Sequence, residues 1–207
     1  FKSKVIVTCA GLFADRITKM THPDLQLRLV PFRGEYYKLK KEKNNLVNAL
    51  IYPVPDPAFP FLGVHFTRMI NGERECGPNA VLSFKREGYT KTSFNLLDTF
   101  ETFTWNGFHK LIKKHWRMGL GEFYRSYSKK AFARALNKLI PEVTADDFAP
   151  GGAGVRAQAC LKDGILLDDF YIVEDKKVVH VCNAPSPAAT ASLSIGDFIS
   201  DKVLTKL

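Results

Sequence analysis

The stretch VIVTCAGLFADRI (residues 5–17) sets the expected architecture of the chain. Residues 5–10 are apolar or small and predict a buried strand, and Gly11 then predicts a tight turn before a helix. In α/β proteins such a strand-to-helix turn often meets a cofactor, because its glycine admits a close approach and the helix start presents free N–H groups. Taken alone, this signal has little specificity.

Two β-rich blocks follow in the chain. The Asn71-Gly72 pair predicts a hairpin turn, and Arg33-Gly34 is also typical of a turn. The glycines at 151, 152 and 154 lack the Lys-Ser/Thr of a phosphate loop and predict a flexible connection. The predicted strands cover residues 25–30, 35–39, 48–52, 61–69 and 73–77, then 155–159, 170–174 and 178–181.

The region between the two blocks is helical and basic. Apolar spacing predicts one helix over 97–116 and a second over 124–139, separated by Gly119 and Gly121. Residues 109–138 hold nine Lys or Arg and one Glu, so they carry +8 of the net charge of +9. This pattern is open to several interpretations: a solvated helix pair, an anionic membrane surface, a nucleic acid, or attraction of an acidic substrate. No RRM, KH or zinc-finger signature supports the nucleic acid.

The composition limits the class of protein. With 207 residues and 45% hydrophobic content, the chain can form one large domain or two small ones. It has no run of 18 apolar residues and no CxxC pair, which argues against a membrane span, a zinc site and thioredoxin chemistry. We expect Cys9 and Cys182 to be buried thiols in a reducing compartment. The chain starts without Met, and we expect it to be a fragment.

The segment NAPSPAAT (residues 183–190) follows a predicted strand that contains His180. Ser186 as N-cap and Pro187 in the first turn predict a helix over 188–203. Small residues and free N–H groups at such a start suit a flavin or a phosphate. The alternative is a tight helix entry that needs small residues for packing.

Several other side chains are candidates for chemistry. Arg33 and Arg156 each interrupt a β-like stretch, and a buried guanidinium needs an anion, which can be a ligand or an internal carboxylate. His65 and His180 lie in predicted strands, where an imidazole serves as a base or as a hydrogen-bonded core residue.

Four segments of the chain resemble the D-amino-acid oxidase-like superfamily of flavin enzymes and, within it, the L-2-hydroxyglutarate dehydrogenases. They are PFRGEYYKLK (31–40), IYPVPDPAFPFLGVHFTRMINGERECGPNAVLSFKREGY (51–89), GVRAQACLKDGILLDDF (154–170) and HVCNAPSPAATASL (180–193). The resemblance implies an α+β fold, with a mixed, largely antiparallel substrate-domain sheet, flanking helices, and the terminal strand and helix of a Rossmann-like FAD-binding domain.

The resemblance also implies a division of the chain. The family places a GxGxxG element in its FAD domain, and this sequence has none. We therefore expect a C-terminal portion that neither holds FAD tightly nor is active alone. The expected divisions are 1–22 (FAD domain), 23–150 (substrate domain with the basic helices at 94–140) and 151–207 (second β block and FAD-facing helix).

The activity implied by the resemblance is oxidation of L-2-hydroxyglutarate to 2-oxoglutarate, with hydride transfer from C2 to flavin N5. By resemblance Arg156 would bind a substrate carboxylate, His65 would be the base and His180 the second choice, and Arg33 and Tyr52 would be further substrate-site residues. No metal is expected. FAD would contact residues of two segments: Ala10, Gly11, Leu12, Asn183, Ala184, Ser186, Pro187, Ala188, Ala189 and Thr190.

Two alternatives to this activity stay open. One is a related flavin oxidase that acts on an amino acid or a glycerol phosphate. The other is a basic binding module for a nucleic acid or a membrane. The resemblance implies a mitochondrial, membrane-associated enzyme if the source is eukaryotic, and the basic helices are then candidates for a peripheral membrane contact. No nucleic-acid partner is expected, and the electron acceptor is not specified.

Overall fold

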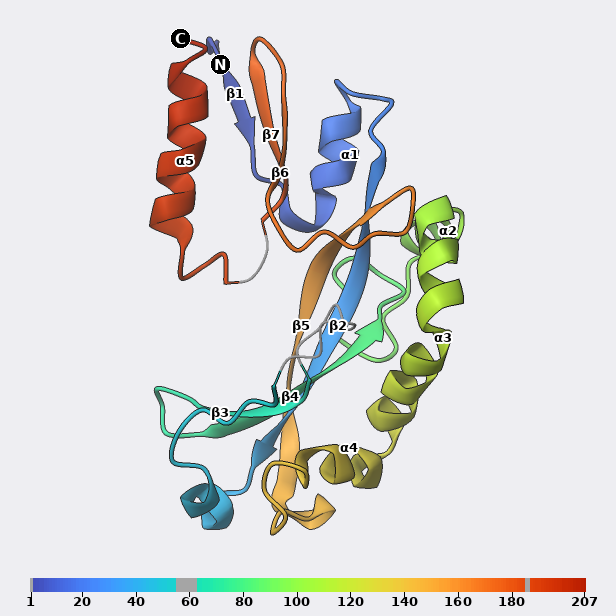
Figure 1. Cartoon of the computed structure of the whole chain (residues 1–207), viewed down its shortest axis with the longest axis vertical. Coiled ribbons are helices and arrows are strands. Elements are labelled where there is room, and N and C mark those ends of the chain that lie inside the picture. The colour runs from blue at the N-terminus through green and yellow to red at the C-terminus, as the bar shows by residue number, and fades with distance from the viewer. Residues whose placement is uncertain (1, 55–62, 185–186) are drawn as a thin grey trace. The chain divides into compact units, whose positions relative to one another are not determined.

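A computed structural model describes residues 2–54, 63–184 and 187–207 (Figure 1). The chain forms two compact units. Unit 1 comprises Phe1–Val30, Leu97–Lys110 and Ala157–Leu207, and unit 2 comprises Pro31–Leu96 and Leu111–Arg156. These limits differ from the boundaries predicted at residues 22 and 150. The predicted assignment of domains stays a prediction.

Unit 1 contains a three-stranded sheet in the order β1-β7-β6. β1 (Ile6–Thr8) is parallel to β7 (Val178–Asn183), and β6 (Tyr171–Glu174) is antiparallel to β7. The short helices η1 (Gly11–Phe13) and α1 (Ala14–Lys19) follow β1, and α1 packs against β7. The predicted order of strand, turn and helix for residues 5–17 is therefore confirmed, but the strand was expected to be buried and β1 is mostly exposed, with Ile6 55% and Val7 40% exposed.

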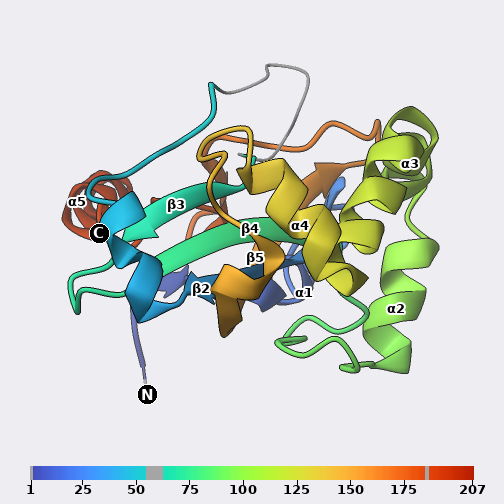
Figure 2. The same ribbon diagram turned by 90° about the horizontal axis from the view of Figure 1, so that it is seen from below.

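Unit 2 is built on a four-stranded sheet in the order β3-β4-β2-β5. One face of this sheet packs against α4 (Lys129–Leu136), which lies in front of the strands in Figure 2. Phe132 and Leu136 of α4 form a core with Phe66, Cys76 and Phe148. The strands are β2 (Leu27–Leu39), β3 (His65–Arg68), β4 (Arg74–Leu82) and β5 (Phe148–Leu161), and the short 3-10 helices are η2 (Lys41–Leu46) and η3 (Ala145–Asp147).

The mixed α+β class with a largely antiparallel sheet is confirmed, and so is the hairpin between β3 and β4. Gly72 has φ +83°, and its N–H donates to the Met69 carbonyl at 3.0 Å. Two strand predictions were wrong. Residues 33–34 do not turn, because β2 runs on through them with a bulge between Glu35 and Tyr37. The predicted strand at 48–52 contributes only an isolated bridge between Ile51 and Phe66.

The helical region also differs from its prediction. Its helices are α2 (Leu96–Phe103), α3 (Asn106–Tyr127) and α4. Gly119 and Gly121 lie inside α3, because a glycine weakens a helix by about 1 kcal/mol without ending it. The φ/ψ irregularity of α3 is at His115, and Ser128 caps α4 by accepting the Ala131 N–H at 3.2 Å.

The last helix, α5 (Ser192–Leu204), begins four residues later than predicted, and its N-cap Ala191 makes no side-chain cap. The predicted cap, Ser186, lies outside the described residues. Pro187 to Ala191 form a turn in which the Ala191 N–H donates to the Pro187 carbonyl at 3.1 Å. Of the two cysteines predicted to be buried, Cys182 is buried and Cys9 is exposed.

The glycines at 151–154 belong to β5 and do not form a flexible connection. Gly151 lies against the backbone of β2, where a Cβ atom would be 2.5 Å from the Tyr36 carbonyl oxygen. The glycine there allows two strands to approach closely.

We predict that Gly151→Ala lowers the free energy of unfolding by about 1–3 kcal/mol, because the added methyl group displaces β2. Gly152→Ala is the matched control, since no atom lies within 4 Å of its added Cβ. Urea denaturation of both variants measures the difference. Equal stability of the two variants would contradict the proposed close contact.

Candidate functional site

His65 lies on the face of the unit 2 sheet opposite the core. It pairs with Gly77 across β3 and β4, whereas the next pair, Phe66 and Cys76, points into the core. The ring of Tyr52 stacks on the imidazole, with centroids 4.1 Å apart and planes 24° apart. Burial lowers the pKa of His65, and its hydrogen bond with the Gly63 carbonyl, at 2.9 Å, partly offsets this effect. A neutral imidazole at pH 7 can accept a proton.

Tyr36 crosses the same face beside Gly77. A Cβ atom at Gly77 would be 2.8 Å from Cδ1 of Tyr36, and Gly77 has φ +145°, so a side chain is excluded there. Burial raises the pKa of Tyr36, the charge of Glu75 adds to this rise, and the guanidinium of Arg156 opposes it.

Three predicted site residues, His65, Tyr52 and Arg156, belong to unit 2. Tyr52 contacts His65 directly, and the charge of Arg156 affects the pKa of Tyr36. Tyr36 was not among the site residues predicted from the sequence. The sequence did contain a signal for it. Once β2 is continuous, Tyr36 and Gly34 are two residues apart and lie on the same face of the strand. The arrangement offers a cation, a phenol and a neutral imidazole, which suits a substrate that carries a carboxylate and a hydroxyl group.

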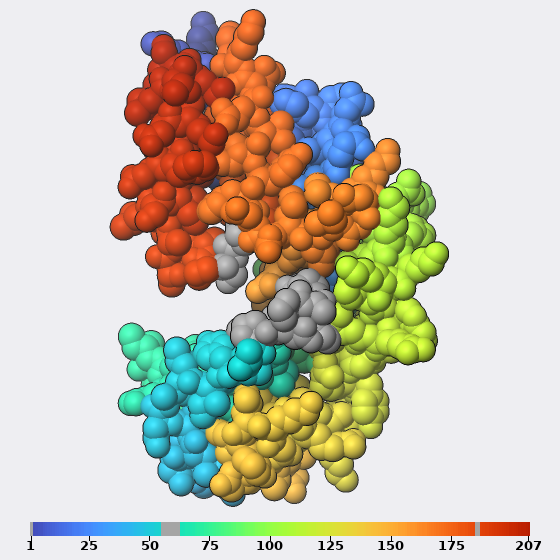
Figure 3. Space-filling model, in the orientation of Figure 1, coloured from blue at the N-terminus to red at the C-terminus, as the bar shows by residue number. Residues whose placement is uncertain are grey.

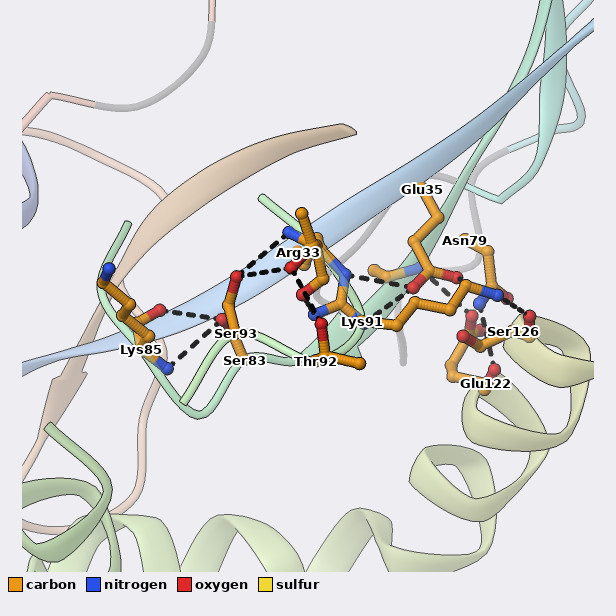
Figure 4. Close-up of polar contacts among 12 residues, drawn as sticks. Arg33, Glu35, Asn79, Ser83, Lys85, Lys91, Thr92, Ser93, Glu122 and Ser126 are labelled. Atoms are coloured by element: carbon orange, nitrogen blue, oxygen red, sulfur yellow. Dashed lines mark hydrogen bonds and ion pairs between the residues drawn. The ribbon is translucent and has the colours of Figure 1, made fainter. Parts of the chain in front are cut away.

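Arg33 is held by groups of the protein itself. Its Nε and Nη2 donate to Glu35 Oε1 at 3.0 and 2.7 Å (Figure 4). Its Nη1 donates to the Thr90 carbonyl at 2.9 Å. Only 4% of Arg33 is exposed. The anion that Arg33 needs is therefore an internal carboxylate, which was one of the two alternatives predicted for it. Its role in substrate binding stays a prediction that this ion pair disfavours.

His180, the second candidate base, has partners on both ring nitrogens. Nδ1 lies 2.8 Å from Thr8 Oγ1 and Nε2 lies 2.8 Å from Thr21 Oγ1, and only 2% of the residue is exposed. The His22 ring meets it edge-on at 5.5 Å. These contacts join β7 to β1 and to the segment after α1, so they favour a structural role over a catalytic one.

Burial lowers the pKa of His180, and the neighbouring His22 lowers it further. The folded state therefore binds fewer protons than the unfolded state, and the stabilisation by neutral His180 is complete above about pH 6.5 and is lost as the pH falls. We predict that the free energy of unfolding falls less between pH 7 and pH 5.5 in His180→Gln than in the wild type. Urea titrations at the two pH values measure this. Identical pH dependence would contradict the assignment.

The two predicted cofactor segments meet at one edge of the unit 1 sheet. Because β1 and β7 are parallel neighbours, their carboxyl ends lie together, with residues 10–12 following β1 and residues 183–184 ending and following β7. Gly11 has φ +50°, and no atom lies within 4 Å of its Cβ position, so the turn is open beside it. The Asn183 amide donates to the Asp169 carbonyl at 2.7 Å and so positions that segment.

The remaining residues predicted to contact FAD belong to the turn before α5, apart from Ser186, which lies outside the described residues. Ala188, Ala189 and Thr190 are in this turn, and Thr190 Oγ1 donates to the Pro187 carbonyl at 3.0 Å. Among the described residues, no cluster of His, Cys, Asp or Glu is arranged to hold a metal ion. No helix in the described ranges is long and apolar enough to cross a bilayer.

Comparison with known proteins defines the class. A family model described as FAD dependent oxidoreductase, DAO, matches residues 1–202, and the chain belongs to this family. L-α-glycerophosphate oxidase from Mycoplasma pneumoniae, solved in a reduced state with FAD bound, aligns over 93% of this chain and 40% of its own, with a TM-score of 0.59. Its sequence identity is 18%, so this similarity concerns the fold alone.

The curated relatives are more specific. L-2-hydroxyglutarate dehydrogenase of Indibacter alkaliphilus is 56% identical over all of this chain and 52% of that protein. The enzyme of the same name from Escherichia coli K12 is 48% identical over all of this chain and 49% of its length. A mitochondrial relative from Nematostella vectensis is 48% identical over 97% of this chain and 45% of its length. The chain thus spans about half the length of these relatives.

Proposed function

We propose that the complete protein containing this chain oxidises L-2-hydroxyglutarate to 2-oxoglutarate with FAD as its cofactor. The observation that carries the proposal is the identity of 46–56% with relatives named L-2-hydroxyglutarate dehydrogenase, across essentially the whole chain. Unit 2 supports it, because His65 and Tyr36 lie beside Gly77 on one face of the sheet and the positive charge of Arg156 acts on Tyr36.

Each side chain has a defined task in this proposal. Arg156 binds a carboxylate of the substrate by charge-assisted hydrogen bonds. His65 accepts the proton of the C2 hydroxyl group at Nε2, the ring nitrogen that does not bond the Gly63 carbonyl, and its lowered pKa keeps it neutral and ready to do so. Tyr36 offers a neutral phenol beside Arg156, since burial holds its pKa above the ordinary value.

The residues of unit 1 fit a flavin cofactor in the described segments. The open turn at Gly11 and the small residues at 188–189 leave room for a close ligand approach, and they follow two parallel strands at their carboxyl ends. We propose that these segments hold part of the FAD. When bound, FAD supplies the electron acceptor for the oxidation.

A substrate panel tests this function. With the complete protein loaded with FAD, we expect turnover of L-2-hydroxyglutarate with an artificial electron acceptor, and little turnover of D-2-hydroxyglutarate, amino acids or glycerol 3-phosphate. Preferential turnover of an amino acid or glycerol 3-phosphate would instead identify a related flavin oxidase. A nucleic-acid-binding module is not favoured, because the family and the relatives are oxidoreductases.

A second proposal is a peripheral contact between α3 and an anionic membrane. Trp116, Leu120, Tyr124 and Tyr127 recur at helical spacing on α3 and are 51%, 61%, 60% and 73% exposed. α3, in yellow-green, lies at the surface in Figure 3. The basic residues Lys113 and Lys114 precede Trp116 in α3, and Arg117 follows it directly. Helices that combine exposed aromatic and basic residues bind lipid interfaces. Eukaryotic relatives from Nematostella vectensis and Dictyostelium discoideum are named as mitochondrial.

Co-sedimentation with vesicles tests the membrane contact. We predict that the complete protein binds phosphatidylcholine vesicles only when they contain an anionic lipid, and that binding weakens as salt rises. The double variant Trp116→Ser/Leu120→Ser should bind at least about tenfold more weakly, because it removes exposed apolar side chains that would enter the interface. Ile70→Ser, at an exposed apolar residue of the β3–β4 turn, is the control. Undiminished binding of the double variant would contradict a role for α3.

A further inference from the structure

The contact between Tyr52 and His65 is built into the backbone of unit 2. Ile51 and Phe66 form an isolated antiparallel bridge, with each N–H donating to the other's carbonyl at 3.0 Å. In an antiparallel pair the neighbouring residues, 52 and 65, then lie opposite each other. The bridge therefore places the Tyr52 ring over the imidazole and explains the 4.1 Å separation of their centroids.

The hydrogen bond of His65 fixes which ring nitrogen carries the proton. Nδ1 lies 2.9 Å from the Gly63 carbonyl oxygen, and a carbonyl oxygen can only accept a hydrogen bond. Nδ1 must therefore carry the hydrogen. A neutral imidazole has one N–H, so Nε2 holds the free lone pair and is the nitrogen able to accept a proton.

The two stacked side chains differ in exposure, and this difference indicates different roles. His65 is 9% exposed, whereas Tyr52 is 43% exposed and covers one side of the imidazole. Among the described residues, the titratable and charged groups on this side of the sheet include Tyr36, Glu75 and Lys38, which pairs with Glu75, and the charge of Arg156 acts on Tyr36. The lowered pKa of His65 arises from burial, which the Tyr52 ring helps to provide.

We propose that Tyr52 is a positioning residue for His65: its stacked ring and the Gly63 carbonyl together hold the imidazole with Nε2 as the proton acceptor. The inference rests on the proposed function, in which His65 is the base. It changes the role of Tyr52 from a direct substrate contact, as predicted from the sequence, to control of the imidazole orientation. The aromatic ring carries this role, and the hydroxyl group is dispensable.

Two substitutions in the complete, FAD-loaded protein separate ring from hydroxyl. Tyr52→Phe keeps the stacking ring, and we expect its kcat and KM to stay within about twofold of the wild type. Tyr52→Leu removes the ring, and we expect kcat to fall about tenfold or more while KM changes by less than about threefold, because the base is misplaced. Tyr89→Leu is the matched control, since Tyr89 is a 52% exposed tyrosine of the same unit.

The pH profile provides a readout that general destabilisation would not produce. Without the covering ring, His65 is less buried, so its pKa rises toward the ordinary value and the acid limb of kcat/KM moves to higher pH. We expect this movement in Tyr52→Leu and not in Tyr52→Phe or Tyr89→Leu. A raised KM with unchanged kcat in Tyr52→Phe would overturn the inference in favour of substrate binding through the hydroxyl group.

Nitrogen NMR of ¹⁵N-histidine-labelled protein tests the inference without relying on turnover. We expect an unprotonated Nε2 and a protonated Nδ1 for His65 in the wild type and in Tyr52→Phe, and a mixture of tautomers in Tyr52→Leu. An unprotonated Nδ1 in the wild type, or an unchanged tautomer in Tyr52→Leu, would overturn the inference. A fully active His65→Ala variant would instead remove the base assignment, while the tautomer measurement would still test the stack.

Discussion

Replacing His65 by alanine should lower kcat of the complete protein by about 10²- to 10⁴-fold, the usual contribution of a general base. The physical reason is that the Nδ1 bond to the Gly63 carbonyl leaves Nε2 as the proton acceptor of this buried imidazole, on the face of the unit 2 sheet opposite the core. Flavin absorbance should be retained, because the predicted cofactor segments belong to unit 1. Steady-state kinetics and the absorbance spectrum measure the two effects.

A matched control for this variant is His115→Ala, at the irregular position of α3 in helical surroundings. We expect it to keep normal kcat. If His65→Ala were as active as His115→Ala, the base would have to be another group. His180 would be a poor replacement, because both of its ring nitrogens already have threonine partners.

Replacing Arg156 by alanine should lower kcat/KM for L-2-hydroxyglutarate by at least about tenfold and raise KM. The loss corresponds to about 1.5–3 kcal/mol for hydrogen bonds between a charged donor and a carboxylate. Arg156→Lys should recover part of the loss, since lysine keeps the charge but not the paired N–H geometry of the guanidinium.

The control for Arg156 is Arg134→Ala, which removes an exposed arginine from α4 in the same unit. Both variants lose one positive charge, so a general electrostatic effect on an anionic substrate would appear equally in both. Equal kinetics of the two variants would remove Arg156 from the substrate site.

The strands that were predicted correctly are those whose signals are local. β1, β6 and β7 are short apolar runs, and the β3–β4 turn has Gly72 where a positive φ is required. The continuity of β2 was missed because Gly34 is typical of a turn. Gly34 is instead required by packing, because a Cβ atom at this position would lie 3.0 Å from Cβ of Pro78 in the neighbouring strand β4. A contact with a residue 44 positions away gives no local pattern.

The same limit explains the site residues. Glu35 lies two residues after Arg33, so it shares a face with Arg33 once the strand is continuous, and the ion pair could then have been predicted. The threonine partners of His180 come from β1 and from the segment after α1, and no pattern around His180 indicates them. The His65–Tyr52 stack likewise depends on a bridge between distant backbone segments.

The most direct test of the proposed function is anaerobic mixing of the complete, FAD-loaded protein with L-2-hydroxyglutarate, followed by the flavin absorbance spectrum. We predict that L-2-hydroxyglutarate bleaches the oxidised flavin and yields 2-oxoglutarate, and that the D-isomer does not. A flavin that stays oxidised with L-2-hydroxyglutarate but is bleached by glycerol 3-phosphate or an amino acid would contradict the proposal.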